Sequence, residues 1–196
     1  MQKVSLEKAI QVLKNGGIVF YPTETVYGIG GNALDPQVID QIYELKGRPQ
    51  HLPISVLIDS IETLRKYAVS ISPSAEDLMR RYWPGPLTLI FEVGDDFPQK
   101  LHAGSRKVGF RISSHPQAQA LVQALGLPMT TTSANPSGKK PAESVEELQN
   151  YFKDSPLIGP ILDGGRLEPC EVSTVLDVSA DPPRIIREGV IRINLF

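Results

Sequence analysis

The feature that most constrains this chain is the alternation of short apolar runs with segments of helical periodicity, which extends over most of its length. Apolar residues spaced three and four apart predict helices, and short continuous apolar runs predict buried strands. Helices are predicted over residues 6–13, 36–46, 61–68, 73–82, 116–125 and 144–152. Strands are predicted over residues 18–21, 54–58, 87–93, 108–112, 129–132, 157–162, 174–178, 184–187 and 191–195. This order predicts an α/β fold with a largely parallel or mixed sheet covered by helices.

The totals point to one globular unit. A length of 196 residues suits one domain, which we predict to span residues 1–196. The single Cys170 excludes an intramolecular disulfide and any multi-cysteine zinc site, and it fits a reducing, cytoplasmic compartment. No apolar run approaches the roughly 20 residues of a membrane helix, and no signal peptide is recognisable, so no membrane partner is expected. A net charge of −2 argues against a generally basic nucleic-acid binder but permits a local basic patch.

Two polar segments follow predicted strands directly. The first, Y-P-T-E-T-V-Y-G at residues 21–28, offers the hydroxyls of Thr23 and Thr25 and the carboxylate of Glu24. The second, T-T-T-S-A-N-P-S-G at residues 130–138, carries more hydrogen-bonding groups than a connection requires. Loops at strand ends are where α/β proteins usually bind ligands. Turns in which hydroxyls bond their own backbone explain the same residue types, so both interpretations stay open.

Four cationic residues are candidates for binding phosphate. Lys46 and Arg48 flank the end of the helix at residues 36–46, where cations also stabilise the helix dipole. Arg111 lies within one predicted strand and Arg187 near the end of another, where arginine is seldom buried without a partner. A salt bridge at the rim of the sheet is the alternative explanation for both arginines. Spacing alone does not rank these interpretations.

Several motifs are absent or incomplete. G-I-G-G-N-A at residues 28–33 satisfies the dinucleotide fingerprint, but it begins well after the preceding strand ends and lacks the acidic residue expected downstream. There is no Walker-type phosphate loop. His51, His102 and His115 are too far apart in sequence for metal-ligand spacing, and no metal site is predicted.

The ordered set of motifs resembles one family closely. Y-P-T-E-T-V-Y-G, K-G-R-P, W-P-G-P-L-T, T-S-A-N-P-S-G, S-T-V-L-D and R-E-G follow one another as they do in the YrdC/TsaC family of threonylcarbamoyl-AMP synthases. The resemblance runs from about residue 18 to residue 191, and its single-domain extent is similar to that of the family's short form. It implies a twisted mixed sheet flanked by helices, with a large concave basic cleft.

The resemblance also implies an activity and its residues. The family joins L-threonine, bicarbonate or CO2, and ATP into threonylcarbamoyl-adenylate and pyrophosphate, with Mg²⁺ carried by the nucleotide. The product serves tRNA modification through a partner threonylcarbamoyl-transferase complex, and family members are linked to direct binding of double-stranded RNA or tRNA. The catalytic signatures fall on Lys46, Arg48, Ser133 and Asn135. Those four residues, with Arg111 and Arg187, correspond to the ATP site, and the threonine pocket corresponds to Thr23, Thr131, Ser173 and His115.

Two segments depart from the family pattern. R-E-G at residues 187–189 replaces the common R-P-G, and Q-H-L-P-I-S follows K-G-R-P at residues 50–55 in place of the usual segment. R-E-G-V is also similar to the YciO-like branch, so a paralogue that mainly binds nucleotide or double-stranded RNA is the alternative function. That branch typically lacks the K-x-R and S-x-N signatures. Both are intact here, which favours a synthase.

Overall fold

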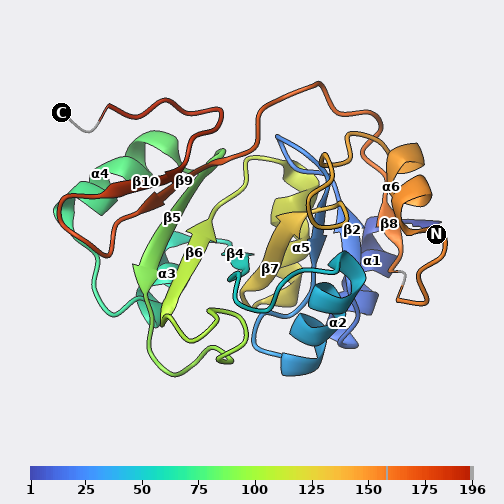
Figure 1. The fold of residues 1–196 in the computed structure, drawn as a ribbon, viewed down its shortest axis with the longest axis horizontal. Coiled ribbons are helices and arrows are strands. Elements are labelled where there is room, and N and C mark those ends of the chain that lie inside the picture. Colours follow the sequence, from blue (N-terminus) through green and yellow to red (C-terminus); the bar gives the residue numbers. More distant parts are fainter. Residues whose placement is uncertain (158, 195–196) are drawn as a thin grey trace.

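The computed structural model describes residues 1–157 and 159–194 and contains one mixed sheet (Figure 1). The described strands are β1 (Lys3–Val4), β2 (Val19–Tyr21), β3 (Gly28–Gly30), β4 (Ser55–Leu57), β5 (Leu87–Glu92), β6 (Lys107–Arg111), β7 (Met129–Ser133), β8 (Ile161–Leu162), β9 (Thr174–Asp177) and β10 (Arg184–Arg187). Their order in the sheet is β1-β8-β2-β3-β7-β4-β6-β5-β9-β10. The pairs β1–β8, β2–β8, β4–β6 and β5–β9 are parallel and the others antiparallel. The predicted mixed α/β sheet is confirmed.

The helices begin and end at residues with clear local reasons. They are α1 (Leu6–Lys14), α2 (Pro36–Lys46), α3 (Ile61–Tyr67), α4 (Pro73–Tyr82), α5 (Pro116–Leu125) and α6 (Val145–Phe152). In α2 the Asp35 side chain accepts a hydrogen bond from the Gln37 amide, and proline occupies the first helical position. Gly47 ends α2 in the left-handed conformation, with φ of 57°, which glycine adopts without a steric penalty. Because of this turn, the side chains of Lys46 and Arg48 leave the backbone in different directions.

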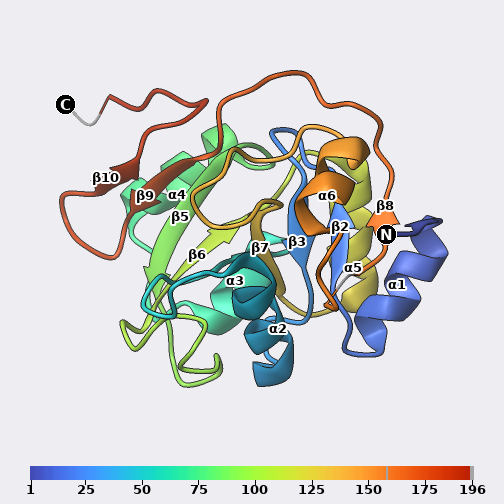
Figure 2. The ribbon, with the colours of Figure 1, turned by 45° about the vertical axis from the view of Figure 1, so that its right-hand side comes forward.

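Helices cover the two faces of the sheet unequally. The larger core cluster joins alternate strand residues, such as Phe20, Ile29 and Phe110, to α2, α3, α4 and α6. The smaller cluster joins intervening residues, such as Tyr21 and Met129, to α1 and α5 alone. Figure 2 shows α1 and α5 lying side by side near β2. Part of the second face is therefore left without a covering helix.

Two strand predictions need correction. The predicted strand at residues 191–195 is wrong for residues 191–194, and Leu195 lies outside the described residues. Ile191 is held by the Thr174 side chain, which donates to its carbonyl (2.7 Å) and accepts from its amide (3.0 Å), so no strand ladder forms. Of the strand predicted at residues 157–162, only β8 forms among the described residues, and Ile158 lies outside them. Pro160, directly before β8, has no amide to donate to a strand ladder.

Two strands were missed by the sequence analysis. Residues 28–30, part of the incomplete dinucleotide fingerprint, form β3, which pairs with both β2 and β7. The two-residue strand β1 pairs with β8 at one edge of the sheet. Within the described part of the chain, no helix has the length and apolarity needed to cross a membrane.

Candidate functional site

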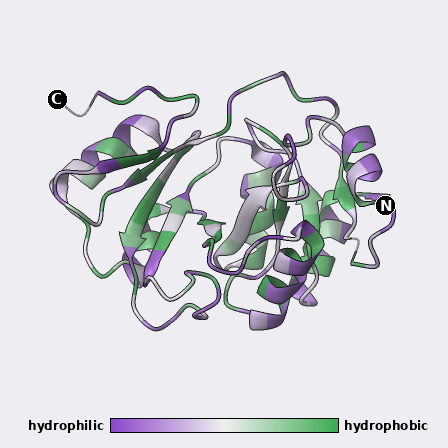
Figure 3. Ribbon diagram, in the orientation of Figure 1, coloured by the Kyte–Doolittle hydropathy of each residue, from purple (hydrophilic) through white to green (hydrophobic). Residues whose placement is uncertain are grey.

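The candidate site lies on the sheet face that, among the described helices, α1 and α5 alone cover. Where strands pass beyond these helices, this face carries glycine, serine and threonine in place of large apolar residues. Gly28 on β3 pairs with Ser133 on β7, and Thr131 on β7 pairs with Ser55 on β4. In Figure 3, β7 is pale where β5 is strongly hydrophobic in colour. The short side chains leave an open hollow floored by polar groups.

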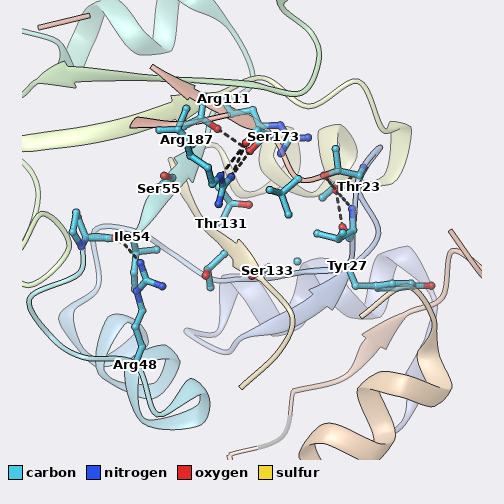
Figure 4. A pocket seen from close by; sticks show the side chains of 18 residues that line it. Thr23, Tyr27, Arg48, Ile54, Ser55, Arg111, Thr131, Ser133, Ser173 and Arg187 are labelled. Carbon is cyan, nitrogen blue, oxygen red and sulfur yellow. Dashed lines mark hydrogen bonds between the residues drawn. The ribbon is translucent and has the colours of Figure 1, made fainter. Parts of the chain in front are cut away.

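The pocket over this floor has an empty volume of about 730 Å³. Its lining comprises Thr23, Thr25, Val26, Tyr27, Gly28, Arg48, Pro53, Ile54, Ser55, Thr88, Arg111, Thr131, Thr132, Ser133, Val172, Ser173, Val175 and Arg187. Figure 4 shows Arg111, Arg187 and Ser173 together on one side and Arg48 on the other, with Ser55, Thr131 and Ser133 between them. Seven of the ten predicted site residues line this one pocket, and the other three, Lys46, Asn135 and His115, do not. Arg111, Ser133 and Arg187 end strands β6, β7 and β10, whereas Arg48 follows α2.

Arg111 is the only one of the three pocket arginines that pairs with a carboxylate among the described residues. Its Nη2 lies 2.8 Å from Glu24 Oε1, and its Nε donates to the Gly85 carbonyl at 3.2 Å. Both side chains of the ion pair are largely buried, at 7% and 16% exposure. Glu24 also accepts hydrogen bonds from the Ser113 hydroxyl and the Ser114 amide. Burial raises the pKa of Glu24, but Arg111 and these donors outweigh it and lower the pKa below its usual value.

Among the described residues, Arg187 and Arg48 donate only to neutral acceptors. Arg187 donates to the Ser173 carbonyl from Nε (3.1 Å) and Nη2 (2.8 Å) and to the Ser173 hydroxyl (3.0 Å). Arg48 donates to the carbonyls of Leu52 (3.2 Å) and Pro53 (2.9 Å). Desolvation, followed by the charges of Arg111 and Arg48, lowers the pKa of Arg187. No carboxylate among the described residues compensates the positive charge of these two guanidinium groups. A bound anion would therefore relieve the repulsion between them.

Lys46 and Asn135 lie behind the pocket wall rather than in its lining. The Lys46 ammonium donates to the backbone carbonyls of Ser133 and Asn135, the latter at 2.8 Å. The Asn135 amide donates to the carbonyls of Pro136 (2.9 Å) and Lys139 (2.8 Å). Burial, with a contribution from the charge of Arg48, lowers the pKa of Lys46 to about 7. Both side chains thus brace the loop that follows β7, and neither reaches the pocket in this structure.

Thr23 and His115 were both predicted to bind threonine, and the structure places only Thr23 in the pocket lining. The Thr23 hydroxyl donates to the Val26 carbonyl (2.7 Å) and accepts from the Thr25 and Val26 amides (3.2 Å each), so the local turn foreseen for this segment is present even though Thr23 lines the pocket. His115 is the N-cap residue directly before α5, its side chain makes no capping hydrogen bond, and it is not in the pocket lining. Burial lowers the pKa of His115 despite the opposing charge of Glu24.

Sequence reasoning missed part of the floor. Ser55 and Thr88 belong to apolar strands, and a single small polar residue in such a strand does not indicate a binding site. Gly109 on β6 also makes room, because a Cβ there would lie 2.6 Å from the Ser55 hydroxyl oxygen and 2.9 Å from the Thr88 methyl carbon. The available signal was small residues recurring on one face of neighbouring strands, which is visible only once the strand order is known.

Fold and site together define an α/β protein with an arginine- and hydroxyl-lined pocket on an open sheet face. The chain belongs to the Sua5/YciO/YrdC family, whose family description is "Telomere recombination" and which matches residues 11–189. The predicted family resemblance is confirmed.

Individual relatives carry more specific names. The chain is 38% identical over 177 residues to a threonylcarbamoyl-AMP synthase of Pyrococcus abyssi, covering 90% of this chain and 52% of that protein. It is 32% identical over 177 residues to a threonylcarbamoyl-AMP synthase of Marinobacter nauticus, covering 89% and 92%. The crystal structure of P. abyssi Sua5 complexed with L-threonine superposes with a TM-score of 0.89 at 37% identity, covering 94% of this chain and 54% of that one. The chain thus spans about half the length of the Pyrococcus relative.

Proposed function

We propose that this chain, as a single domain spanning residues 1–196, is an L-threonylcarbamoyladenylate synthase. The observation that carries the proposal is the convergence of Arg48, Arg111 and Arg187 on one pocket floored by hydroxyls. A cationic rim with short polar groups beneath it suits a triphosphate and a small amino acid bound together. The names of the relatives, and the L-threonine in the Pyrococcus complex, support these substrates.

The proposed reaction has two steps. The amine of L-threonine attacks CO2, forming a C–N bond and releasing a proton to solvent, to give a carbamate. A carbamate oxygen then attacks the α-phosphorus of ATP, and the bond to the β-phosphate breaks to release pyrophosphate. Mg²⁺ enters on the nucleotide as part of the substrate. Because the site contains no obvious covalent nucleophile, its residues would act by positioning the reactants and stabilising charge.

The different charge environments of the three arginines suggest that they have different roles in binding the substrates. Arg48 and Arg187, which have no carboxylate partner among the described residues, would neutralise triphosphate oxygens. Arg111, already neutralised by Glu24, would act as an oriented donor. Thr131, Ser173 and Thr23 would contact threonine, and Ser133 would orient phosphate or carbamate. Lys46 and Asn135 would contribute by shaping the wall that presents Ser133.

Further parts of the proposal concern the setting of the reaction. The adenylate would pass to a threonylcarbamoyl-transferase complex that modifies tRNA, in the cytoplasm. Direct binding of double-stranded RNA or tRNA is a separate property, and thermal melting separates the two. Stabilisation by ATP plus L-threonine supports the synthase, whereas stabilisation by RNA alone supports an RNA-binding module.

The direct test supplies the purified chain with ATP, Mg²⁺, bicarbonate and each standard amino acid in turn, and measures pyrophosphate. The proposal predicts release that requires bicarbonate and is fastest with L-threonine. Release that is independent of the amino acid, or no release with any of them, contradicts it.

A further inference from the structure

Tyr21 reaches the pocket floor from two strands away. Tyr21 on β2 pairs with Gly28 on β3, Gly28 pairs with Ser133 on β7, and Thr131 lies two residues before Ser133 on the same face. The Tyr21 hydroxyl donates a hydrogen bond to the Thr131 hydroxyl oxygen at 2.9 Å. The tyrosine side chain therefore crosses the whole width of β3 to reach a residue that lines the pocket.

The two glycines of β3 make this crossing possible. A Cβ on Gly28 would lie 2.9 Å from Cζ of Tyr21, and a Cβ on Gly30 would lie 2.9 Å from Cε1 of Tyr21 and 2.7 Å from the Thr130 carbonyl oxygen. Real Cβ atoms do not approach so closely, so any other residue at Gly28 would displace the ring, and any other residue at Gly30 would displace the ring and the backbone of β7. The G-x-G pair that resembled a dinucleotide fingerprint is instead a slot for an aromatic ring.

The hydrogen bond has a defined direction, and the direction matters. Tyr21 is fully buried, and burial raises the pKa of its hydroxyl, so the group stays protonated and donates. The Thr131 oxygen accepts the hydrogen bond from the Tyr21 O–H. The Thr131 O–H therefore points away from Tyr21 and is free to donate to another group. Among residues 1–157 and 159–194, no side chain or carbonyl accepts a hydrogen bond from that O–H, and Thr131 lines the pocket.

We infer that Tyr21 is a positioning residue that fixes the Thr131 hydroxyl as a hydrogen-bond donor to a carboxylate oxygen of the amino-acid substrate. The inference rests on the proposed function and adds a specificity element to it. A preset donor favours an acceptor at that point of the pocket, because a donor in the same place on the ligand would face another donor.

The test is a double-mutant cycle on Tyr21→Phe and Thr131→Val, read as KM for L-threonine, KM for ATP and kcat. Y21F keeps the ring in its slot and should raise the threonine KM about three- to tenfold, with kcat and the ATP KM nearly unchanged. T131V should raise the threonine KM about tenfold or more, and T131S, which keeps the hydroxyl, should stay close to wild type. Because Tyr21 acts only through Thr131, the double variant should match T131V alone.

The outcomes separate this inference from the proposed function. If the wild-type chain releases no threonine-dependent pyrophosphate, both fail. If the wild-type chain is active but the two effects on the threonine KM multiply, or Y21F raises both KM values alike, the positioning role fails and the synthase stands. Thermal melting checks folding, and should T131V not fold, the selectivity of Y21F for the threonine KM alone decides the outcome.

Discussion

The two faces of this sheet are built from alternate residues of the same strands, yet they serve different purposes. On one face, Phe110 and its neighbours are fully buried under helices. On the other, the adjacent Arg111 reaches an open pocket. The first face buries apolar area, which stabilises the fold, whereas the second gives up that area to place charge and hydroxyls at a binding site. Neighbouring positions in one strand should therefore respond to mutation in opposite ways.

The largest effect on stability is expected at the covered face. Phe110→Ala removes a ring that packs against Phe91 and Phe97, with centroids 6.1 and 5.9 Å away. The free energy of unfolding should fall by about 3–5 kcal/mol, while pyrophosphate release per folded molecule stays near wild type. Urea unfolding combined with the activity assay at low temperature measures both. A variant that lost activity but kept its stability would contradict the division between faces.

The largest effect on activity is expected at the open face. Ser133→Ala should lower kcat by about 10²–10³, because one positioned donor is lost, with little change in melting temperature. Ser137→Ala is the matched control, since Ser137 is exposed in the loop that follows Ser133 and does not line the pocket. Equal losses in the two variants would show that loop folding, rather than the Ser133 hydroxyl, limits the reaction.

An intermediate effect is expected at Glu24. Glu24→Gln keeps the shape but removes the charge that partners Arg111, and it should lower the free energy of unfolding by about 1.5–3 kcal/mol. Glu171→Gln breaks a surface pair with Arg192 in which both side chains are more than half exposed, and it should change stability by about 0–1 kcal/mol. Chemical denaturation compares the two. Similar values would mean that the Glu24–Arg111 pair is not shielded from solvent.

At neutral pH, where its contribution has hardly begun to change, Lys46 is expected to show a pH dependence of stability. The folded pKa of Lys46 is about 7, below its ordinary value of 10.5, so the unfolded chain binds more protons between these values. The stability of wild type relative to Lys46→Met should therefore rise with pH from about 7 to about 10.5, by at most about 1.4 kcal/mol per pH unit, and stay flat below pH 7. A relative stability that falls across this window would contradict the assigned shift.

Sequence patterns predicted most of the fold because local chemistry sets it. Asp35, Pro36 and Gly47 define α2, which has the predicted bounds. The prediction of strands was wrong in two segments where the local residue types suggest a different structure from the one that tertiary contacts produce. Residues 28–30 contain one apolar residue and two glycines, which suggest a loop, although they pair on both sides. Residues 191–194 alternate like a strand but are tied to a threonine side chain instead.

The sequence predicted which residues belong to the candidate site better than it predicted how their side chains are arranged. The family resemblance predicted Arg111, Arg187 and Ser133 as members of one site, and the structure places all three in the lining of one pocket. Spacing could not tell that Lys46 points behind the wall while Arg48, two residues later, points into the pocket. The turn at Gly47 is local, but the register of β7, which places the carbonyls that hold Lys46, is set by tertiary pairing.

The most direct test of the central claim compares two arginines of one strand. Arg187 lines the pocket and Arg184 does not, although both lie on β10. Threonine-dependent pyrophosphate release should fall about 10²–10³-fold in Arg187→Ala and remain near wild type in Arg184→Ala. Wild-type release by Arg187→Ala would contradict the assignment of this open sheet face as the site where ATP and threonine react.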